Sequence, residues 1–379
     1  MEYNARFLSA LAVAAIFLTL TGEAALIKVS PGESIQAAID RAATDDRIVV
    51  QGGIYHESLN ISKSIFMEGQ DHAMLVSGAG DSGITLRADR ITIFGFDRRT
   101  TRRTGIHALS NDNVIINNSI SGCIDGIRLE HARNNSLAFN EINNNTNGIT
   151  LISSKKNLIE KNNIMNNNIG EENDCGIFLA YSEGNVILRN NLSDNGDASI
   201  SLRSSSNNHL RENNISLNDW YGISLSESSN NNLILANNLD KNKDAGIYLD
   251  SCRGNAVLNN TATRNAKGIY FAFDSNDNLL EGNTVSENKK GFYLAYHSSN
   301  NSIRDNTLLK NGYGIYLTFS AGWNLMVQNK LIDNGINAYD RGLNNRWDNG
   351  LVGNYYSDLG KVFYIPGGSG VDKHPMAAE

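Results

Sequence analysis

The sequence predicts an all-β protein, a single-stranded right-handed parallel β-helix (solenoid) of about 13 three-strand coils with an N-terminal helical cap. The main observation is a four-residue phrase that recurs with a period in the twenties. Its successive glycines lie 22, 23 and 23 residues apart. A fixed period of this length is typical of stacked supersecondary units. The four copies are Gly246-Ile247-Tyr248-Leu249, Gly268-Ile269-Tyr270-Phe271, Gly291-Phe292-Tyr293-Leu294 and Gly314-Ile315-Tyr316-Leu317.

Each period also contains three short apolar segments, which predict three strands per coil. In one copy they occupy residues 247–249, 256–257 and 261–263. Apolar residues two apart indicate a strand with one buried face, and the intervening Asn and Gly tolerate the tight turns between strands. Neither hairpin-length alternation nor 3.6-residue spacing lies between the segments, which argues against hairpins and helical repeats. We expect the β-helix to be right-handed because crossover connections between parallel strands are usually right-handed.

Asparagine recurs at fixed places in the period. Side-chain amides stacked one coil apart can hydrogen-bond along a column, so we expect these asparagines to be structural. One column precedes the second strand of each coil and comprises Asn157, Asn185, Asn208, Asn232, Asn255, Asn278, Asn301 and Asn324. A second column, before the third strand, comprises Asn140, Asn163, Asn191, Asn214, Asn238, Asn260, Asn283, Asn306 and Asn329.

The N-terminus is expected to be a secretory signal peptide over residues 1–24. Arg6 precedes an apolar run from residue 7 to residue 20, and Gly22-Glu23-Ala24 offers a small-residue cleavage site. An uncleaved anchor is the alternative, although the run is short for a bilayer span. No second apolar segment of that length follows. The mature chain is therefore expected outside the cytoplasm, whether secreted, periplasmic or on the cell surface, with no membrane span after cleavage.

The remaining chain is predicted to form one elongated unit. Residues 25–46 form an N-terminal cap segment with a short amphipathic helix whose apolar face is Ile35, Ala38, Ile39 and Ala42, because a solenoid must cover the open end of its core. Strands over 47–51, 58–61 and 64–68 begin the stack, the β-helix continues over 47–340, and 341–379 form a C-terminal capping segment.

Composition excludes some classes of function. The 379-residue chain has a formal charge of −7, which argues against nucleic acid as a partner. Cys123, Cys175 and Cys252 fall in different coils, so neither a disulfide framework nor a Cys-x-x-Cys metal site is predicted. We expect three buried thiols.

Three segments near the N-terminus resemble one known family. The run 31–39 (Pro-Gly-Glu-Ser-Ile-Gln-Ala-Ala-Ile), Gly53-Ile54-Tyr55-His56-Glu57 and Lys63-Ser64-Ile65 look like the opening of the NosD-type family. The resemblance implies a secreted right-handed β-helix with parallel β-helix repeats, related to carbohydrate-binding proteins and sugar hydrolases.

The C-terminus resembles the closing segment of archaeal surface proteins of the same kind, in residues 347–350, 353–358 and 364–368. Tyr356 stands where those proteins usually carry Trp, and their acidic stretch is missing between Asp358 and Tyr364. NosD itself is associated with copper-site assembly. Because histidine and methionine are scattered here, no cofactor is predicted from the residues, and copper and calcium are the ions that the resemblance leaves open.

One irregular segment interrupts the early coils. Residues 97–103 place four arginines within six positions of a predicted loop. Such a loop offers a grip for an anionic glycan or phosphate. A solvated loop that protects a strand edge from pairing is the alternative.

A column of outward residues carries the prediction of a binding site. In each Gly-Ile-x-Leu strand Ile and Leu point inward, so x faces outward. This column reads His107, Arg128, Thr150, Phe178, Ser201, Ser224, Tyr248, Tyr270, Tyr293 and Tyr316, and Tyr339 is expected to continue it. Two residues past the Leu position, a second aromatic row contains Phe273, Tyr296 and Phe319, with Trp323 near its end.

Aromatic rings spaced by one strand separation form a platform that suits sugars, since ring faces stack and tyrosine hydroxyls hydrogen-bond. The alternative is plain structural stacking, because tyrosine favours strands and stacks on itself. The predicted carbohydrate-binding residues are Tyr248, Tyr270, Tyr293, Tyr316, Tyr296, Phe273 and Phe319.

Two acidic residues beside this face are the candidate catalytic residues. Asp250 follows Leu249, and Asp274 follows Phe273 one coil later. Neighbouring coils can supply the separation that paired glycosidase carboxylates need. The signature motifs of pectin esterases, alginate epimerases and polygalacturonases are missing from the sequence.

These features predict a secreted or cell-surface β-helix that binds a polysaccharide or a glycoprotein glycan, or that serves as an envelope or adhesion module. One alternative is a polysaccharide lyase, hydrolase or epimerase that acts at the same face. The others are a NosD-like periplasmic factor for copper-site maturation and a structural spacer without a ligand. The oligomeric state stays open.

Overall fold

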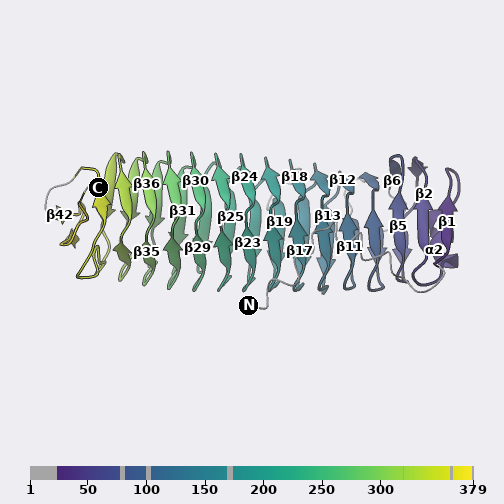
Figure 1. Cartoon of the computed structure of the whole chain (residues 1–379), viewed down its shortest axis with the longest axis horizontal. Helices are drawn as coiled ribbons and strands as arrows, with labels where there is room; N and C mark the ends of the chain where they lie inside the picture. Colours follow the sequence, from purple (N-terminus) through teal and green to yellow (C-terminus); the bar gives the residue numbers. More distant parts are fainter. Residues whose placement is uncertain are drawn as a thin grey trace.

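The computed structural model describes residues 24–76, 82–99, 104–168, 174–318, 320–358 and 362–377. These residues form a long parallel β-solenoid, with β1 and α2 at one end and β42 at the other (Figure 1). Two of its sheets have 14 strands and the third has 13, so the shaft has about 14 turns. The predicted all-β solenoid of three-strand coils with a short N-terminal helix is confirmed. The predicted signal peptide, apart from Ala24, lies outside the described residues.

The first sheet contains the strands that follow one column of buried asparagines. Its strands, in spatial order, are β1 (Leu26–Val29), β2 (Arg47–Val50), β5 (Phe66–Gly69), β8 (Thr92–Phe94), β11 (Val114–Ile116), β14 (Ser136–Ala138), β17 (Leu158–Glu160), β20 (Val186–Leu188), β23 (His209–Arg211), β26 (Leu233–Leu235), β29 (Ala256–Leu258), β32 (Leu279–Glu281), β35 (Ser302–Arg304) and β38 (Leu325–Val327).

The second sheet carries the repeated glycine phrase. Its strands are β4 (Leu59–Ile61), β7 (Ser82–Leu86), β10 (Thr104–Ala108), β13 (Asp125–Glu130), β16 (Asn147–Ile152), β19 (Cys175–Ala180), β22 (Ala198–Arg203), β25 (Tyr221–Ser226), β28 (Ala245–Asp250), β31 (Lys267–Ala272), β34 (Lys290–Leu294), β37 (Tyr313–Leu317) and β40 (Ile336–Asp340).

The third sheet completes each coil. Its strands are β3 (Gly53–Tyr55), β6 (Ala73–Val76), β9 (Asp97–Arg99), β12 (Ser119–Ser121), β15 (Glu141–Asn143), β18 (Asn163–Met165), β21 (Asn191–Ser193), β24 (Asn214–Ser216), β27 (Asn238–Asp240), β30 (Thr261–Thr263), β33 (Thr284–Ser286), β36 (Thr307–Leu309), β39 (Lys330–Ile332) and β41 (Tyr355–Tyr356). Of the early strands, β1 and β3 were not among those predicted from the sequence.

The core is a continuous column of aliphatic side chains between the three sheets. In one coil Ile247 and Leu249 of the second sheet, Val257 of the first and Ala262 of the third are all 0% exposed. In the next coil Ile269 lies beside Ile247, in parallel register. Because apolar residues two apart point to the same face of a strand, the repeated phrase supplies the second sheet's share of this core.

Three buried asparagine ladders run along the corners of the shaft. In each, the backbone N–H of an asparagine, and at nearly every rung its side-chain amide as well, donates to the side-chain oxygen of the asparagine one coil later. Asn255 Nδ2, for example, donates to Asn278 Oδ1 at 3.2 Å, and the Asn255 backbone N–H reaches the same oxygen at 2.8 Å. The first predicted column is therefore a ladder of this kind.

The second predicted column mixed two neighbouring rows, which is a correction to the sequence interpretation. The buried ladder runs through Asn162, Asn190, Asn213 and Asn237, each 1% exposed. The predicted members Asn163, Asn191, Asn214 and Asn238 form a separate row that begins the strands of the third sheet. A third ladder, which the sequence analysis missed, comprises Asn145, Asn167, Asn195, Asn218, Asn242, Asn265, Asn288, Asn311 and Asn334.

The arginine segment also departs from the prediction of a solvated loop. Residues 97–99 form strand β9, in register with the following strand β12, and Arg98 lies opposite Ile120. Side chains alternate along a strand, so Arg98 points inward and is 1% exposed. Its Nη1 donates to the Leu75 carbonyl at 2.7 Å, and burial lowers the pKa of its guanidinium. Residues 100–103 lie outside the described residues.

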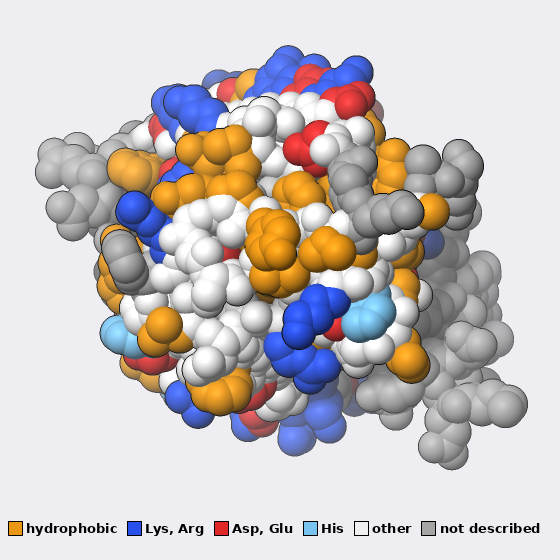
Figure 2. Space-filling view, turned by 90° about the vertical axis from the view of Figure 1, so that its left-hand side faces the viewer, with side chains coloured by type: hydrophobic (Ala, Val, Ile, Leu, Met, Phe, Trp, Pro, Cys, Tyr) orange, Lys and Arg blue, Asp and Glu red, His pale blue; other side chains and the backbone are white. Residues whose placement is uncertain are grey.

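Both ends of the shaft carry additional segments. At the N-terminal end α2 (Ile35–Arg41) begins at Ser34, whose side chain accepts from the Ala37 N–H, and it buries Ile35, Ala38 and Ile39. At the other end β42 (Phe363–Tyr364) and β43 (Val371–Asp372) form an antiparallel hairpin. Figure 2 views that end and shows hydrophobic, charged and other side chains mixed over it. In the part of the chain that the structure describes, no helix is long and apolar enough to cross a bilayer.

Candidate functional site

The outer face of the second sheet brings the predicted outward column into one line. Strand register aligns His107 with Arg128 and continues residue by residue to Tyr316 and Tyr339. The glycine of the repeated phrase makes this close stacking possible. A Cβ on Gly246 would lie 2.7 Å from the Gly268 carbonyl oxygen, so a larger residue there would push adjacent coils apart.

The C-terminal half of this line is an uninterrupted aromatic row, which we call the tyrosine belt. Tyr248 and Tyr270 have ring centroids 5.1 Å apart, Tyr270 and Tyr293 4.7 Å, and Tyr293 and Tyr316 5.5 Å. The belt comprises Trp220, Tyr221, Tyr248, Tyr270, Tyr293, Tyr313, Tyr316 and Tyr339. The sequence analysis missed Trp220, Tyr221 and Tyr313, although they flank the repeated glycine at fixed offsets.

The tyrosine rings of the belt are half-buried, whereas Trp220 is exposed. Burial raises the pKa of Tyr221 to about 12 and also raises the pKa values of Tyr248, Tyr270 and Tyr293. Their hydroxyls therefore stay protonated and can donate hydrogen bonds at neutral pH. The Tyr248 hydroxyl already donates to Asp250 Oδ2 at 3.1 Å. The belt thus offers ring surface together with a line of hydroxyl donors and acceptors.

A second aromatic pair lies at the turn that follows these strands. Phe273 and Tyr296 are stacked with centroids 4.6 Å apart, and about half of each side chain is exposed. Both adopt left-handed backbone angles, with φ of 35° and 51°. Left-handed angles recur at turns along the whole solenoid, including at Phe139 and Tyr181, so this backbone conformation belongs to the turn and the stacking of two exposed rings is what distinguishes the pair. The predicted Phe319 lies outside the described residues, and Trp323 lies on the same turn with 65% of its surface exposed.

Lysines border the belt on the side where the strands begin. Lys267 and Lys290 occupy the same position on adjacent strands. The Lys290 ammonium lies 3.9 Å from the Tyr293 ring centroid and 4.4 Å from that of Tyr316. The Lys267 ammonium lies 4.7 Å from the Tyr270 centroid and pairs with Asp244. The electron-rich ring faces therefore already hold cations.

The opposite half of the same face carries a charged cluster that the sequence analysis did not single out. His107 Nε2 lies 3.1 Å from Glu130 Oε2, and Arg128 bridges Glu130 and Asp125 at 3.2 Å each. Thr150 Oγ1 donates to Asp125 Oδ1 at 2.5 Å. Burial lowers the pKa of His107, and the Arg128 and His107 contacts lower the pKa of Glu130 against the opposing effect of burial. Each carboxylate is held by a partner in this cluster.

The two candidate catalytic residues lie at the edge of the belt on adjacent coils. Asp250 ends β28 and accepts hydrogen bonds from Tyr248 and Ser251. Asp274 is exposed at the next turn, where its backbone N–H donates to the Tyr296 carbonyl oxygen. Asp250 pairs in register with Ala272 rather than with Asp274, so the two residues are offset by one coil along the shaft and by two residues along the chain direction of the strands.

The three parallel sheets of this solenoid, each with one strand from every coil, define its class of protein, the right-handed β-helix. The family model described as the right handed beta helix region matches residues 52–172 and 104–262, more than half of the chain. Residues 221–360 match the model described as the periplasmic copper-binding protein NosD. The chain therefore belongs to the right-handed β-helix family, with repeats of the NosD type.

Two solved structures share this fold at low sequence identity. The Dettilon tailspike protein is 17% identical with a TM-score of 0.63, and the match covers 74% of this chain and 66% of that one, just under two thirds of its length. The A-module of mannuronan C-5 epimerase AlgE6 from Azotobacter vinelandii is 14% identical with a TM-score of 0.60, and the match covers 83% of this chain and 93% of that one. No curated protein matches the chain.

The NosD description names copper, but the described residues of this chain do not form a set of ligands that fits copper. Across residues 24–76, 82–99, 104–168, 174–318, 320–358 and 362–377 no group of three or more His, Cys, Asp or Glu side chains is placed to hold an ion. All three cysteines are buried and free, and burial raises the pKa of each thiol to about 12, whereas copper prefers thiolate or imidazole ligands. The expectation of buried thiols is confirmed.

Proposed function

We propose that this protein acts outside the cytoplasm and binds a polysaccharide or the glycan of a glycoprotein through the tyrosine belt. The observation that carries the proposal is the unbroken row of rings along one sheet, from the exposed Trp220 to the half-buried Tyr339. Several belt rings stack on one another along the shaft, so ring edges and hydroxyls form the outer surface, where they meet the apolar C–H groups and the hydroxyls of a sugar chain.

Several features support this role. A row that runs along the shaft axis matches an extended polymer better than a compact ligand. The exposed Phe273–Tyr296 pair widens the same surface beyond the turn. The fold is shared with a tailspike protein and with an epimerase named for mannuronan, and NosD is described as periplasmic.

The test is retention on immobilised glycans. A Tyr270→Ala/Tyr293→Ala variant is expected to lose retention on every glycan that holds the parent protein, because it opens a gap of two rings in the middle of the belt. Phe139→Ala is the matched control: that ring is 37% exposed on a different turn, where Lys161 lies 5.1 Å from its centroid. Circular dichroism would establish that each variant keeps its β-structure. Unchanged retention in the folded double variant would refute the role of the belt.

A second candidate function is cleavage or epimerisation of the bound polymer. The hydrogen bond from the Tyr248 hydroxyl to Asp250 places a carboxylate at the edge of the belt, and Asp274 lies one coil away. Incubation with polysaccharides, followed by analysis of released oligosaccharides and of uronate stereochemistry, tests this. Products that vanish in an Asp250→Asn/Asp274→Asn variant would support it, whereas their persistence in that variant would exclude these two residues.

The proposed location has its own test. If residues 1–24 are a signal peptide, the protein recovered from its native cells begins at about residue 25 and fractionates with the envelope or the medium. N-terminal sequencing of that protein is the measurement. A chain that keeps residue 1 and fractionates with the cytoplasm would refute the proposed location.

A further inference from the structure

A concentration of positive charge borders the tyrosine belt where three successive turns enter β28, β31 and β34. We call this region the basic corner; it comprises Lys241, Lys243, Arg264, Lys267, Lys289 and Lys290. A depression of about 330 Å³ lies within it, lined by four of these cations and by the single carboxylate of Glu287. The whole chain has a formal charge of −7, so this local excess of cations runs against the overall balance.

Half of these cations have acidic partners among the described residues. Arg264 is held by Asp240 through two hydrogen bonds of 2.8 Å, while Lys243 pairs with Asp219 and Lys267 with Asp244. In the part of the chain that the structure describes, no ion pair involves the remaining three, which are Lys241, Lys289 and Lys290.

Lys290 is the cation that joins the corner to the belt. It lies over the Tyr293 and Tyr316 rings and beside Lys267 on the adjacent strand. Burial and the like charge of Lys267 lower the pKa of its ammonium. A carboxylate or sulfate placed here would offset both effects, because it would supply the opposite charge at a partly desolvated site.

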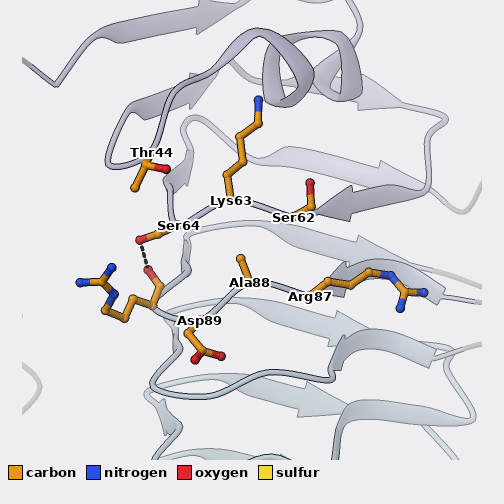
Figure 3. A pocket seen from close by; sticks show the side chains of 8 residues that line it. Thr44, Ser62, Lys63, Ser64, Arg87, Ala88 and Asp89 are labelled. Carbon is orange, nitrogen blue, oxygen red and sulfur yellow. Dashed lines mark hydrogen bonds between the residues drawn. The ribbon is translucent and has the colours of Figure 1, made fainter.

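A second depression with basic residues lies at the N-terminal end of the shaft, far along the chain from the tyrosine belt. It lies beside α2 and is lined by Lys63, Arg87 and Arg90, among others (Figure 3). The Lys63 ammonium donates to the carbonyl oxygens of Asp40 at 2.7 Å and Ala42 at 2.6 Å, so it caps the end of the helix. Arg87 donates to Asn60 Oδ1 at 3.1 Å. These contacts tie two of its three basic side chains to neighbouring protein atoms.

We propose that the basic corner binds the carboxylate or sulfate groups of an acidic polysaccharide whose sugar rings lie along the tyrosine belt. This inference rests on the proposed function and adds the charge of the ligand to it. The belt and the corner run side by side along the shaft over β28, β31 and β34. A chain that lies on the belt therefore meets cations along the same edge, and repeated anionic groups engage more than one coil at once.

The experiment compares three soluble polymers at low salt: a polyuronate, a sulfated polysaccharide and a neutral glucan. Binding of each is measured for the parent protein and for a Lys289→Gln/Lys290→Gln variant. The control is Lys28→Gln/Lys156→Gln, which removes the same charge from exposed positions elsewhere on the shaft. We expect the parent to prefer one or both acidic polymers. The corner variant should bind them about tenfold more weakly, with a smaller salt dependence, and the control should match the parent.

The outcomes separate the two proposals. Preference for the polyuronate alone identifies the carboxylate as the anion, and preference for the sulfated polymer alone identifies the sulfate; either supports the inference. Equal binding of the neutral glucan, with no difference between the corner variant and the control, overturns the basic corner while the belt proposal stands. Loss of all binding in the Tyr270→Ala/Tyr293→Ala variant supports the belt in both cases. If no polymer binds the parent protein, both proposals fail.

Discussion

Replacement of one ladder asparagine tests the forces that hold the coils together. Asn237 Oδ1 accepts from Asn213 N at 3.0 Å and from Asn213 Nδ2 at 2.9 Å, while Asn237 Nδ2 donates to Leu210 O at 2.9 Å and Asn260 Oδ1 at 3.0 Å. Asn237→Ala removes all four hydrogen bonds and leaves the buried Asn213 backbone N–H without that acceptor. At roughly 0.5–1.5 kcal/mol for each bond, the four bonds contribute about 2–6 kcal/mol, and the buried unsatisfied donor adds about 1–3 kcal/mol to the loss.

Asn238→Ala is the matched control because it makes the same substitution, asparagine to alanine, at the next residue of the chain. Asn238 is exposed, and its Nδ2 donates to Asn214 Oδ1 at 2.9 Å on the surface. Its replacement is expected to cost no more than about 0.5 kcal/mol.

The assay is denaturant unfolding followed by circular dichroism, together with hydrogen exchange of the Asn213 amide. Solenoids can unfold locally, so exchange reports the damaged coil even where the global transition is broad. Asn237→Ala should lower the transition midpoint and expose the Asn213 amide, and Asn238→Ala should do neither. Equal midpoints for the two variants would refute the assignment of the stability to the buried ladder.

Three further predictions concern buried titratable groups and the N-terminal cap. Because burial raises the pKa of Tyr221 to about 12 above its ordinary value of 10, the folded state keeps this proton while the unfolded chain loses it. Stability should therefore fall as the pH rises from about 10 to 12, as seen in the melting temperature, and a flat profile would contradict this. All three cysteines should resist a thiol reagent until the protein unfolds, and rapid labelling of the native protein would contradict their burial. The Glu57 carboxylate accepts from the Ile35 and Gln36 N–H groups at 2.9 and 3.0 Å, so Glu57→Ala should lower the free energy of unfolding by about 1–2 kcal/mol in denaturant titration, and an unchanged midpoint would refute this contribution.

The sequence predicted the architecture because the information is local and repeated. The glycine phrase alone specifies the inward Ile and Leu, the outward Tyr and the coil length. The tandem asparagines were harder, since Asn162 and Asn163 are chemically identical. The alternation of side chains along a strand resolves them: Asn162 lies two residues before the inward Ile164 and shares its face. This signal was present in the sequence and was not used.

The charged residues outside the repeated phrase were less predictable. His107, Arg128 and Glu130 meet because adjacent coils bring them together, but an exposed sheet face accepts many pairings of charged side chains. Arg98 was misplaced for a different reason. The glycine phrase recurs on both sides of its strand, at residues 83–86 and 105–108, but a charged residue was not expected at an inward position.

The positions of the repeated glycines have a consequence for how such a protein changes over generations. Each unit of about 23 residues adds one rung, and every rung contacts only its immediate neighbours. Duplication of a whole unit within the belt would lengthen the platform by one ring, about 4.8 Å, and leave the existing contacts intact. A duplication of any other length would shift inward and outward faces. The length of polymer that this surface can contact therefore changes only by whole coils.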